Sequence, residues 1–466
     1  MVSNTYDLHN ACPPEGQVPP GEKYVIAALR AAGHQVDCRL WDEITPPDGH
    51  TIVFVSLMFH RQFWHLPELF RKLELPIDCN TRKCVPVVAG GHGIHNPVAL
   101  ERIFDRVVLG CGEQIAADLC HDLTAWDNTP HVWPNKVAYA LKKDEPCSSL
   151  VARQYDRLIP YIELARGCRH KCFFCELGWT HKYSEASKDS VFSQIDAIAE
   201  QYPRSPINLL APDAAGWPGY QEAIERCYSR GLQPLYNSMR IDSSRDCLVM
   251  SRSCRLGVEG VSERLRARVG KPYTNAAITE HLQALEARGI RSRKLFMIYD
   301  LPWTQEQDYA EFWDLLGRLK LDKGGKITVK FTSFTPMPGT PLQDAPKLLN
   351  KEEHCYLLQM QQNGGYCTQQ LTAVTWVELI GLENQVAQAL GVYCMRAGRE
   401  MLDVLLYADA HGMPRNLPQL YAMFRTLRIP LKEVLAGRNL GVYCRSPYAP
   451  AGFTPQDYTP YGDWDD

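Results

Sequence analysis

The feature that most constrains this 466-residue chain is a group of three closely spaced cysteines. Cys168, Cys172 and Cys175 follow the apolar run at residues 159–165 and lie four and three residues apart. This spacing can bring three thiolates to one face of a tight loop, but it supplies no fourth. A structural zinc ion requires four protein ligands, usually from C-x-x-C pairs, whereas a 4Fe–4S cluster bound by three thiolates keeps one iron open for another ligand. The motif therefore predicts a 4Fe–4S cluster, with zinc or three unrelated thiols as the alternatives.

The composition indicates an ordinary globular protein of a reducing compartment. The chain is 45% hydrophobic and 22% charged, and it carries 17 cysteines. Residues 1–7 lack the basic and apolar regions of a signal peptide, and no apolar run approaches the ~18 residues that span a bilayer. We therefore expect a cytoplasmic protein without membrane association. A net charge of −3 gives no general attraction for nucleic acid, although a local basic surface is not excluded by it.

Other cysteines and a basic run leave two further alternatives. A second metal site could be assembled from the distant cysteines Cys355, Cys367, Cys394 and Cys444. The basic run comprises Arg252, Arg255, Arg264, Arg266, Arg268 and Lys271. We expect it to form a solvated helix face, with a nucleic-acid contact as the alternative.

Residues 1–125 are predicted to form a Rossmann-like, doubly wound α/β domain. Apolar strands at 36–41, 51–57, 85–89 and 106–109 alternate with helical patterns at 21–32, 66–73 and 97–104. Several of these strands end in glycine-rich turns. A first strand before the helix at 21–32 could come only from residues 1–8, which have a poor strand pattern.

Residues 126–158 are predicted to be a linker, and residues 159–345 a partial (β/α)6 barrel. Apolar strands are expected near 160–165, 206–211, 233–238, 254–259, 293–299 and 326–331, with helices between them. The cysteine loop then lies at the carboxyl end of the first barrel strand, where parallel α/β folds place their chemistry. Residues 346–466 are predicted to be an α-helical C-terminal region, with helices at 351–361, 372–389, 394–406 and 417–427 and an irregular tail.

In these motifs the chain resembles the radical S-adenosylmethionine (SAM) superfamily, and within it the cobalamin-dependent class. The resemblance rests on the cysteine spacing, on its flanks Arg166-Gly167 and Phe173-Phe174, and on the α/β domain preceding the barrel. It covers about residues 21–120 and 155–345, and it does not extend to the C-terminal region. The resemblance implies three cofactors, a 4Fe–4S cluster, SAM and cobalamin, together with an electron donor of the flavodoxin or ferredoxin type.

The resemblance also implies site residues at the ends of the barrel strands. Cys168, Cys172 and Cys175 would hold the cluster. The residues implied for SAM binding are Phe174, Asp213, Arg240, Glu259, Ile298 and Leu301. Two positions depart from the family pattern, because Ala211-Pro212-Asp213 replaces Gly-Gly-Glu and Asp300 replaces a glycine. For Arg240 and Glu259, ion pairing within the barrel is the alternative role.

For cobalamin, the resemblance implies residues in the turns that follow the strands of the first domain. They are Met58, Phe59, His60, Arg61, Gly90, Gly91, Gly110, Gly112 and Glu113. Glycines let the backbone approach a large ligand closely. At the lower face of the cobalt, His60 could be a ligand, or Arg61 could block the ligand position. The alternative is that His60 is an ordinary loop residue without a ligand role.

The implied activity is a C-methyltransferase that acts on an unactivated carbon through a 5′-deoxyadenosyl radical and methylcobalamin. Ring contraction or cyclisation by the same cofactors is an allied outcome. A radical SAM enzyme without cobalamin, modifying a tRNA base or a protein side chain, is the second hypothesis, and a non-catalytic iron–sulfur scaffold is the third. The expected substrate is a small molecule or a peptide, and nucleic acid is not excluded.

Overall fold

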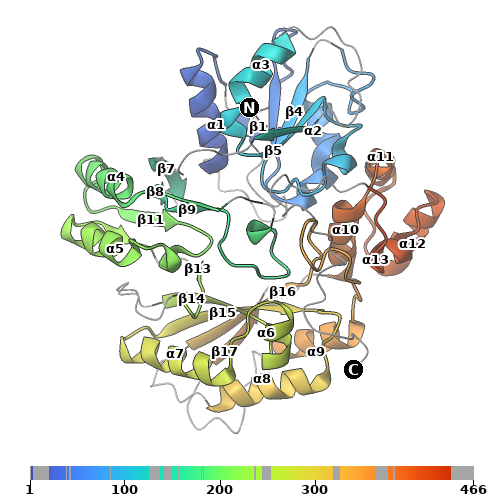
Figure 1. Ribbon diagram of the computed structural model, residues 1–466. Coiled ribbons are helices and arrows are strands. Elements are labelled where there is room, and N and C mark those ends of the chain that lie inside the picture. Colours follow the sequence, from blue (N-terminus) through green and yellow to red (C-terminus); the bar gives the residue numbers. More distant parts are fainter. Residues whose placement is uncertain are drawn as a thin grey trace. The chain divides into compact units, whose positions relative to one another are not determined.

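The chain forms a mixed α/β structure with parallel sheets and many helices (Figure 1). The computed structural model describes residues 2–3, 20–37, 39–40, 44–83, 85–124, 137–140, 149–154, 157–179, 181, 183–235, 238–243, 253–318, 326–362, 376–380 and 384–441. The chain divides into two compact units. The first comprises Met1–Asp144, Leu150–Leu158 and Ala389–Arg445, and the second comprises Glu145–Ser149, Ile159–Gln388 and Ser446–Asp466.

The first unit contains a six-stranded sheet in the order β2-β1-β3-β4-β5-β6. All of its pairings are parallel. The strands are β1 (Val2–Ser3), β2 (Arg39–Leu40), β3 (Val53–Ser56), β4 (Val87–Gly90), β5 (Arg106–Gly110) and β6 (Val137–Ala140). The two residues of β1 pair with both β2 and β3, so the N-terminus does supply the missing strand.

Strand β6 corrects the linker predicted at residues 126–158. Its sequence, Val-Ala-Tyr-Ala, is a short apolar run that pairs with β5 along its whole length. Part of this stretch therefore extends the sheet, and strands β7 (Ser149–Gln154) and β8 (Arg157–Glu163) occupy more of it.

Helices from both ends of the sequence pack in the first unit. The helices around the sheet are α1 (Pro20–Ala31), η2 (His60–His65), α2 (Leu66–Lys72), η3 (Pro97–Leu100), η4 (Gly112–Gln114) and α3 (Ala116–Thr124). From the C-terminal region come the end of α10 (Gln385–Arg396), α11 (Met401–His411), α12 (Leu417–Thr426) and α13 (Leu431–Leu435). Asn96 Nδ2 donates to Ala397 O at 2.7 Å and Arg102 Nη1 donates to Asp403 Oδ2 at 2.8 Å, which ties these helices to the segment after β4.

The second unit contains two sheets built mainly from parallel pairs. In one of them, β11 (Pro206–Leu210) pairs in parallel with β8 on one side and with β12 (Gln233–Pro234) on the other. The other has the order β13-β14-β15-β16-β17, with β13 (Ser238–Met239), β14 (Ser253–Glu259), β15 (Ser292–Tyr299), β16 (Lys326–Ser333) and β17 (Trp376–Ile380). A short antiparallel pair, β9 (Ala165–Arg166) and β10 (Ser184–Glu185), brackets the cysteine loop.

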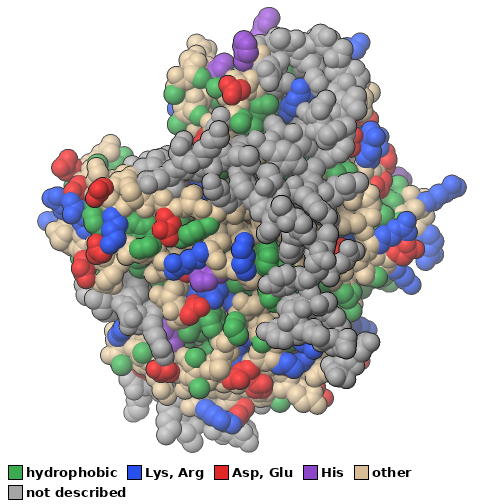
Figure 2. Space-filling model, viewed as in Figure 1, with side chains coloured by type: hydrophobic (Ala, Val, Ile, Leu, Met, Phe, Trp, Pro, Cys, Tyr) green, Lys and Arg blue, Asp and Glu red, His purple; other side chains and the backbone are tan. Residues whose placement is uncertain are grey.

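Helices alternate with these strands. They are η5 (Glu176–Gly178), α4 (Lys188–Gln201), η6 (Ala214–Gly216), α5 (Tyr220–Ser229), α6 (Glu263–Arg268), α7 (Asn275–Ala287), α8 (Glu306–Arg318) and α9 (Lys351–Gln362). Alternate residues of the strands, such as Ile207 and Leu209 in β11, are buried against them. Figure 2 shows basic and acidic side chains intermixed on the face formed by α4 and α5, where Asp196 pairs with Arg226 and Arg230.

Two predictions about the later part of the chain are wrong. The helix expected at 372–389 is instead strand β17 followed by helix α10, because Trp376–Ile380 pairs in parallel with β16. The basic run is not a uniformly solvated face: Arg266 is fully buried and donates to the carbonyls of Tyr273 and Gly260. No helix among the described residues has the length and apolar character needed to cross a membrane.

Candidate functional site

The backbone of the cysteine loop is fixed on several sides. Cys168 N donates to Leu177 O at 3.0 Å, and Phe173 N donates to Val269 O at 3.0 Å. The indole of Trp179 donates to Cys172 O at 2.9 Å. A side chain at Gly178 would place its Cβ 2.1 Å from His170 O, so only glycine fits there. These contacts hold the loop directly after strands β8 and β9.

The three thiols lie in a largely desolvated environment. Cys172 is buried, while Cys168 and Cys175 are partly exposed. Burial is the largest influence on Cys168 and Cys175 and raises the pKa of both thiols. Backbone N–H groups of His170 and Leu177 donate to the Cys168 and Cys175 sulfurs, respectively. No group of three or more Cys, His, Asp and Glu side chains in the described part of the chain is arranged to hold a single metal ion.

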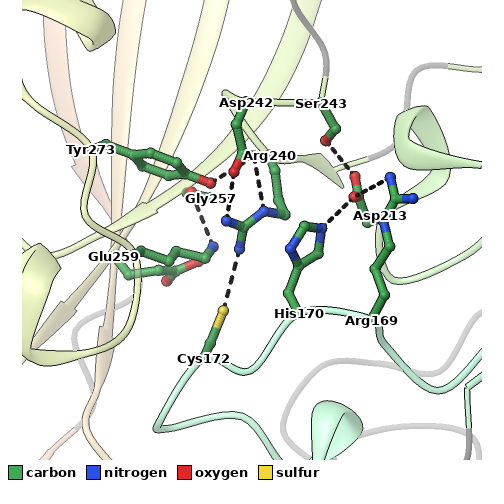
Figure 3. A network of polar contacts seen from close by, with 11 residues as sticks. Arg169, His170, Cys172, Asp213, Arg240, Asp242, Ser243, Gly257, Glu259 and Tyr273 are labelled. Carbon is green, nitrogen blue, oxygen red and sulfur yellow. Dashed lines mark hydrogen bonds and ion pairs between the residues drawn. The ribbon is translucent and has the colours of Figure 1, made fainter. Parts of the chain in front are cut away.

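Arg240 lies at the centre of the polar network around Cys172 (Figure 3). Its Nη1 donates to Cys172 Sγ at 3.3 Å. Its Nε and Nη2 donate to the two carboxylate oxygens of Asp242 at 2.9 and 2.8 Å, and Tyr273 OH donates to Asp242 Oδ1 at 3.0 Å. Burial alone would lower the pKa of Arg240, but the hydrogen bonds and charge of Asp242 raise it above its ordinary value. The guanidinium is therefore a permanent cation beside the sulfur.

Asp213 contacts two of the variable residues of the cysteine motif, Arg169 and His170 (Figure 3). His170 Nε2 lies 2.7 Å from Asp213 Oδ2, and Arg169 Nη2 lies 3.8 Å from the same oxygen. Ser243 Oγ donates to Oδ1 at 2.5 Å. Burial alone would raise the pKa of Asp213, but the hydrogen bonds from His170 and Ser243 keep it below its ordinary value. Both carboxylate oxygens of this predicted SAM residue are thus engaged with the loop and its surroundings.

Glu259 lies at the end of β14 and pairs with Lys271. Lys271 Nζ donates to Glu259 Oε1 at 2.9 Å and to Gly257 O at 3.1 Å, and it lies 5.9 Å from the centre of the Phe174 ring. A register shift in β14 and a φ of 74° at Glu259 turn the chain at this point. Arg240 and Glu259 are therefore both ion-paired, as the alternative for them predicted.

The predicted apolar residues Ile298 and Leu301 lie on either side of Asp300 at the end of β15. Both side chains are buried. Asp300 has a φ of 59°, a backbone conformation that favours glycine, the residue that the family resemblance predicts at this position. Its N–H donates to Glu353 Oε2 at 3.0 Å, and its carboxylate pairs with Lys347 at 2.5 Å.

In the first unit, the predicted cobalamin residues lie in three turns at one edge of the sheet. Strands β3, β4 and β5 are parallel neighbours, so the turns Met58–Arg61, Gly90–Gly91 and Gly110–Glu113 follow the same ends of the strands. Gly91 has a φ of 115°, and a Cβ there would lie 2.5 Å from Leu57 O. Phe59 is 53% exposed, an unusual state for a large aromatic side chain.

His60 faces helix α10 within the first unit. A Cβ at Gly391 would lie 3.0 Å from His60 Nε2, so the ring packs directly on this glycine. Burial, followed by the nearby charges of His95 and Arg61, lowers the pKa of His60 to about 3. The imidazole is therefore neutral at physiological pH.

Several polar residues of the site were missed by the sequence analysis. They are Arg169, His170, Asp242, Ser243, Lys271 and Tyr273. Asp242 and Ser243 lie within two and three residues of Arg240, so proximity to a strand end was an available signal. His170 is part of the cysteine motif itself, but its partner Asp213 is 43 residues away in sequence.

A loop of three cysteines at the carboxyl end of a parallel strand, with polar residues from the neighbouring strand ends around it, is typical of radical SAM proteins, and the chain resembles that class. No protein-family model matches the chain. Among curated proteins, it is 24% identical over 278 residues to a tRNA-2-methylthio-N(6)-dimethylallyladenosine synthase of Vibrio vulnificus, covering 52% of this chain and 57% of that protein. It is 22% identical over 189 residues to an uncharacterised protein of Methanocaldococcus jannaschii, covering 39% of this chain and 42% of that protein. The chain thus spans little more than half the length of the synthase.

Among solved structures, the chain is similar to the cobalamin-dependent SAM radical enzyme OxsB with aqua-cobalamin bound. The identity is 14% and the TM-score 0.45, covering 95% of this chain and 77% of OxsB. It is also similar to coproporphyrinogen III oxidase of Escherichia coli, a radical SAM enzyme, at 16% identity and a TM-score of 0.32, covering 44% of this chain and 52% of that protein.

Proposed function

We propose that the protein is a cobalamin-dependent radical SAM enzyme, and specifically a C-methyltransferase acting on an unactivated carbon. The observation that carries this proposal is the cysteine loop at the end of β8, with a guanidinium donating to the Cys172 sulfur. The proposal includes one partial (β/α)6 barrel, which is formed by β8, β11, β12–β13, β14, β15 and β16. It also includes a doubly wound α/β fold for the first unit.

The residues of the loop fit a 4Fe–4S cluster. Cys168, Cys172 and Cys175 supply three sulfurs in a desolvated setting, and hydrogen bonds reach each of them from Arg240 or from the loop backbone. Such donors stabilise thiolate charge. When bound, the reduced cluster would supply the electron that cleaves SAM to a 5′-deoxyadenosyl radical, and methylcobalamin would supply the methyl group.

The remaining residues of the strand ends bind and orient SAM in this proposal. The adenine ring would contact Phe174, which is partly exposed and packs against the core cluster that contains the buried Ile298 and Leu301. Glu259, which pairs with Lys271, lies at the β14 end, where the ribose and methionine groups of SAM would bind. Asp213 acts on the loop rather than on SAM, because its oxygens are occupied by His170 and Ser243.

In the first unit, the proposal assigns cobalamin to the edge formed by the turns after β3, β4 and β5. Phe59 presents an exposed aromatic ring there, and Gly91 keeps the adjacent backbone free of a side chain. The proposed partners are a small-molecule or peptide substrate and an electron donor of the flavodoxin or ferredoxin type, in the cytoplasm.

A second candidate is a radical SAM enzyme that modifies a tRNA base without cobalamin. The observation that favours it is the sequence match to the tRNA-modifying synthase of Vibrio vulnificus. This candidate requires the same cluster and the same SAM site, and it differs in the role of the first unit.

Anaerobic purification with hydroxocobalamin, followed by an absorption spectrum and SAM turnover with a strong reductant, separates these candidates. A stoichiometric corrin spectrum, with 5′-deoxyadenosine and S-adenosylhomocysteine formed together, supports the methyltransferase. Formation of 5′-deoxyadenosine without bound corrin favours the second candidate. A wild-type chain that binds no iron and sulfide contradicts both.

A further inference from the structure

We propose that Arg240 is a positioning residue that raises the reduction potential of the cluster by donating a hydrogen bond to the Cys172 sulfur. This inference rests on the proposed cluster and goes beyond it, because it assigns Arg240 to cluster tuning rather than to SAM binding. The contact is direct, with Arg240 Nη1 3.3 Å from Cys172 Sγ. Both side chains are largely buried, so water screens the interaction little.

The orientation of the guanidinium is fixed by its other partners. Asp242 accepts from Nε and Nη2 in a two-pronged pair, which leaves Nη1 directed at the sulfur. The guanidinium carbon also lies 5.4 Å from the centre of the Tyr273 ring, whose hydroxyl holds Asp242 from the other side. Figure 3 shows Arg240 between Asp242 and Cys172, with Tyr273 beside Asp242. A planar cation held in this way cannot swing away from the sulfur without breaking the Asp242 pair.

Arg240 acts on one of the three cysteines. The sulfurs of Cys168 and Cys175 receive backbone hydrogen bonds from His170 and Leu177 within the loop itself. The donor to Cys172 is instead a side chain from the end of β13, 68 residues away in sequence. A substitution at Arg240 therefore changes the donor to a single sulfur and leaves the backbone donors to the other two in place.

The sign of the effect follows from charge. One-electron reduction adds negative charge to a cluster and its thiolates, and a cationic donor stabilises that form more than the oxidised form. Loss of the donor should make the cluster harder to reduce. We expect about a tenfold fall in the ratio of reduced to oxidised cluster at a fixed potential, which for one electron corresponds to about 59 mV.

The test is a spectroelectrochemical titration of the full-length, anaerobically reconstituted protein without SAM or substrate. The variants are Arg240→Gln, Arg240→Lys and a control, Ser243→Ala. Ser243 lies on the same segment as Arg240. The control removes its hydrogen bond to Asp213 and does not touch the sulfur. We expect the midpoint to fall in the order wild type, Arg240→Lys, Arg240→Gln, because lysine keeps the charge but loses the two-pronged geometry. Ser243→Ala should titrate like the wild type.

Each outcome decides the matter. A midpoint for Arg240→Gln equal to that of the wild type, at equal iron and sulfide content, overturns the inference. An equal shift in Ser243→Ala also overturns it, because loop distortion would then explain the change. If Arg240→Gln fails to assemble a cluster, Arg240→Lys decides by the same criterion. A wild-type chain without a cluster refutes the proposed function itself.

Discussion

The buried ion pair between Lys347 and Asp300 gives the sharpest stability prediction for the second unit. The Lys347 side chain is 0% exposed and that of Asp300 is 1% exposed, and their charged atoms lie 2.5 Å apart. Lys347 Nζ also donates to Phe334 O at 2.9 Å and to Ser333 Oγ. The pair ties the segment after β16 to the end of β15, where Asp300 has its glycine-like backbone conformation.

Replacing Lys347 by Met should leave an uncompensated carboxylate in the interior. Breaking a buried pair in this way typically costs about 3–5 kcal/mol. Asp300 retains hydrogen bonds from the N–H groups of Leu349 and Asn350, at 3.2 and 3.0 Å, so we expect the lower end, about 3 kcal/mol. For a unit of this size, each kcal/mol lowers the unfolding midpoint by about 2–4 °C, which gives a fall of about 6–12 °C.

Differential scanning calorimetry of the full-length chain measures this effect, with Arg318→Met as the matched control. Arg318 pairs with Asp314 on α8, but their side chains are 75% and 57% exposed, and such surface pairs contribute little. The double variant Lys347→Met/Asp300→Asn should lose less than Lys347→Met alone, because it removes the orphaned charge. The reasoning is refuted if Lys347→Met shifts the midpoint no more than Arg318→Met, or if the double variant is no better than the single one.

Three further predictions concern the two candidate sites and pH. Replacing all three cysteines of the motif by Ala should abolish the brown absorption of reconstituted protein; retention of full iron and sulfide would contradict the cluster. Phe59→Ala should weaken cobalamin binding several-fold in a spectral titration without lowering the unfolding midpoint, since the ring is 53% exposed. His60→Ala should leave the spectrum of bound cobalamin unchanged, because His60 packs on Gly391. The opposite pattern would make His60 the axial ligand. Burial raises the pKa of Glu353 from 4.5 to about 7, so the folded protein holds this proton longer and its stability falls as pH rises from about 4.5 to 7. Glu353→Gln should lack this component, and parallel midpoint–pH curves for wild type and variant would contradict it.

The sequence predicted the positions of the strands well where apolar runs and turn residues coincide. Strands β3, β4, β5, β11, β14, β15 and β16 all lie within or beside the expected runs. The cysteine loop was placed after a strand for the same reason. Strand β17 was missed because Trp376–Ile380 lies within a longer pattern compatible with a helix, and its pairing with β16 depends on tertiary contacts.

Side-chain partners were much less predictable, since they depend on how distant strand ends meet. The contact between His170 and Asp213 joins the cysteine loop after β9 to the turn after β11, and that between Lys347 and Asp300 spans 47 positions. Spacing within one segment cannot reveal such pairs. The departure at Asp300 was visible as a missing glycine, but the compensation by Lys347 was not.

The strand-end charges of the second unit follow a consistent arrangement around the cysteine loop. Asp213, Asp242 and Glu259 come from three different strand ends, and each is paired with a basic group. Only the guanidinium of Arg240 is shared between a carboxylate and a cysteine sulfur among the pairs drawn in Figure 3. Pairing with a basic group reduces the electrostatic cost of placing these carboxylates near the thiolates, although the charge of Asp213 still contributes to the raised pKa of Cys168. The charged group nearest to the Cys172 sulfur is the guanidinium of Arg240. A substitution at Arg240 should therefore change the reduction potential of the cluster more than a substitution at any of the three carboxylates.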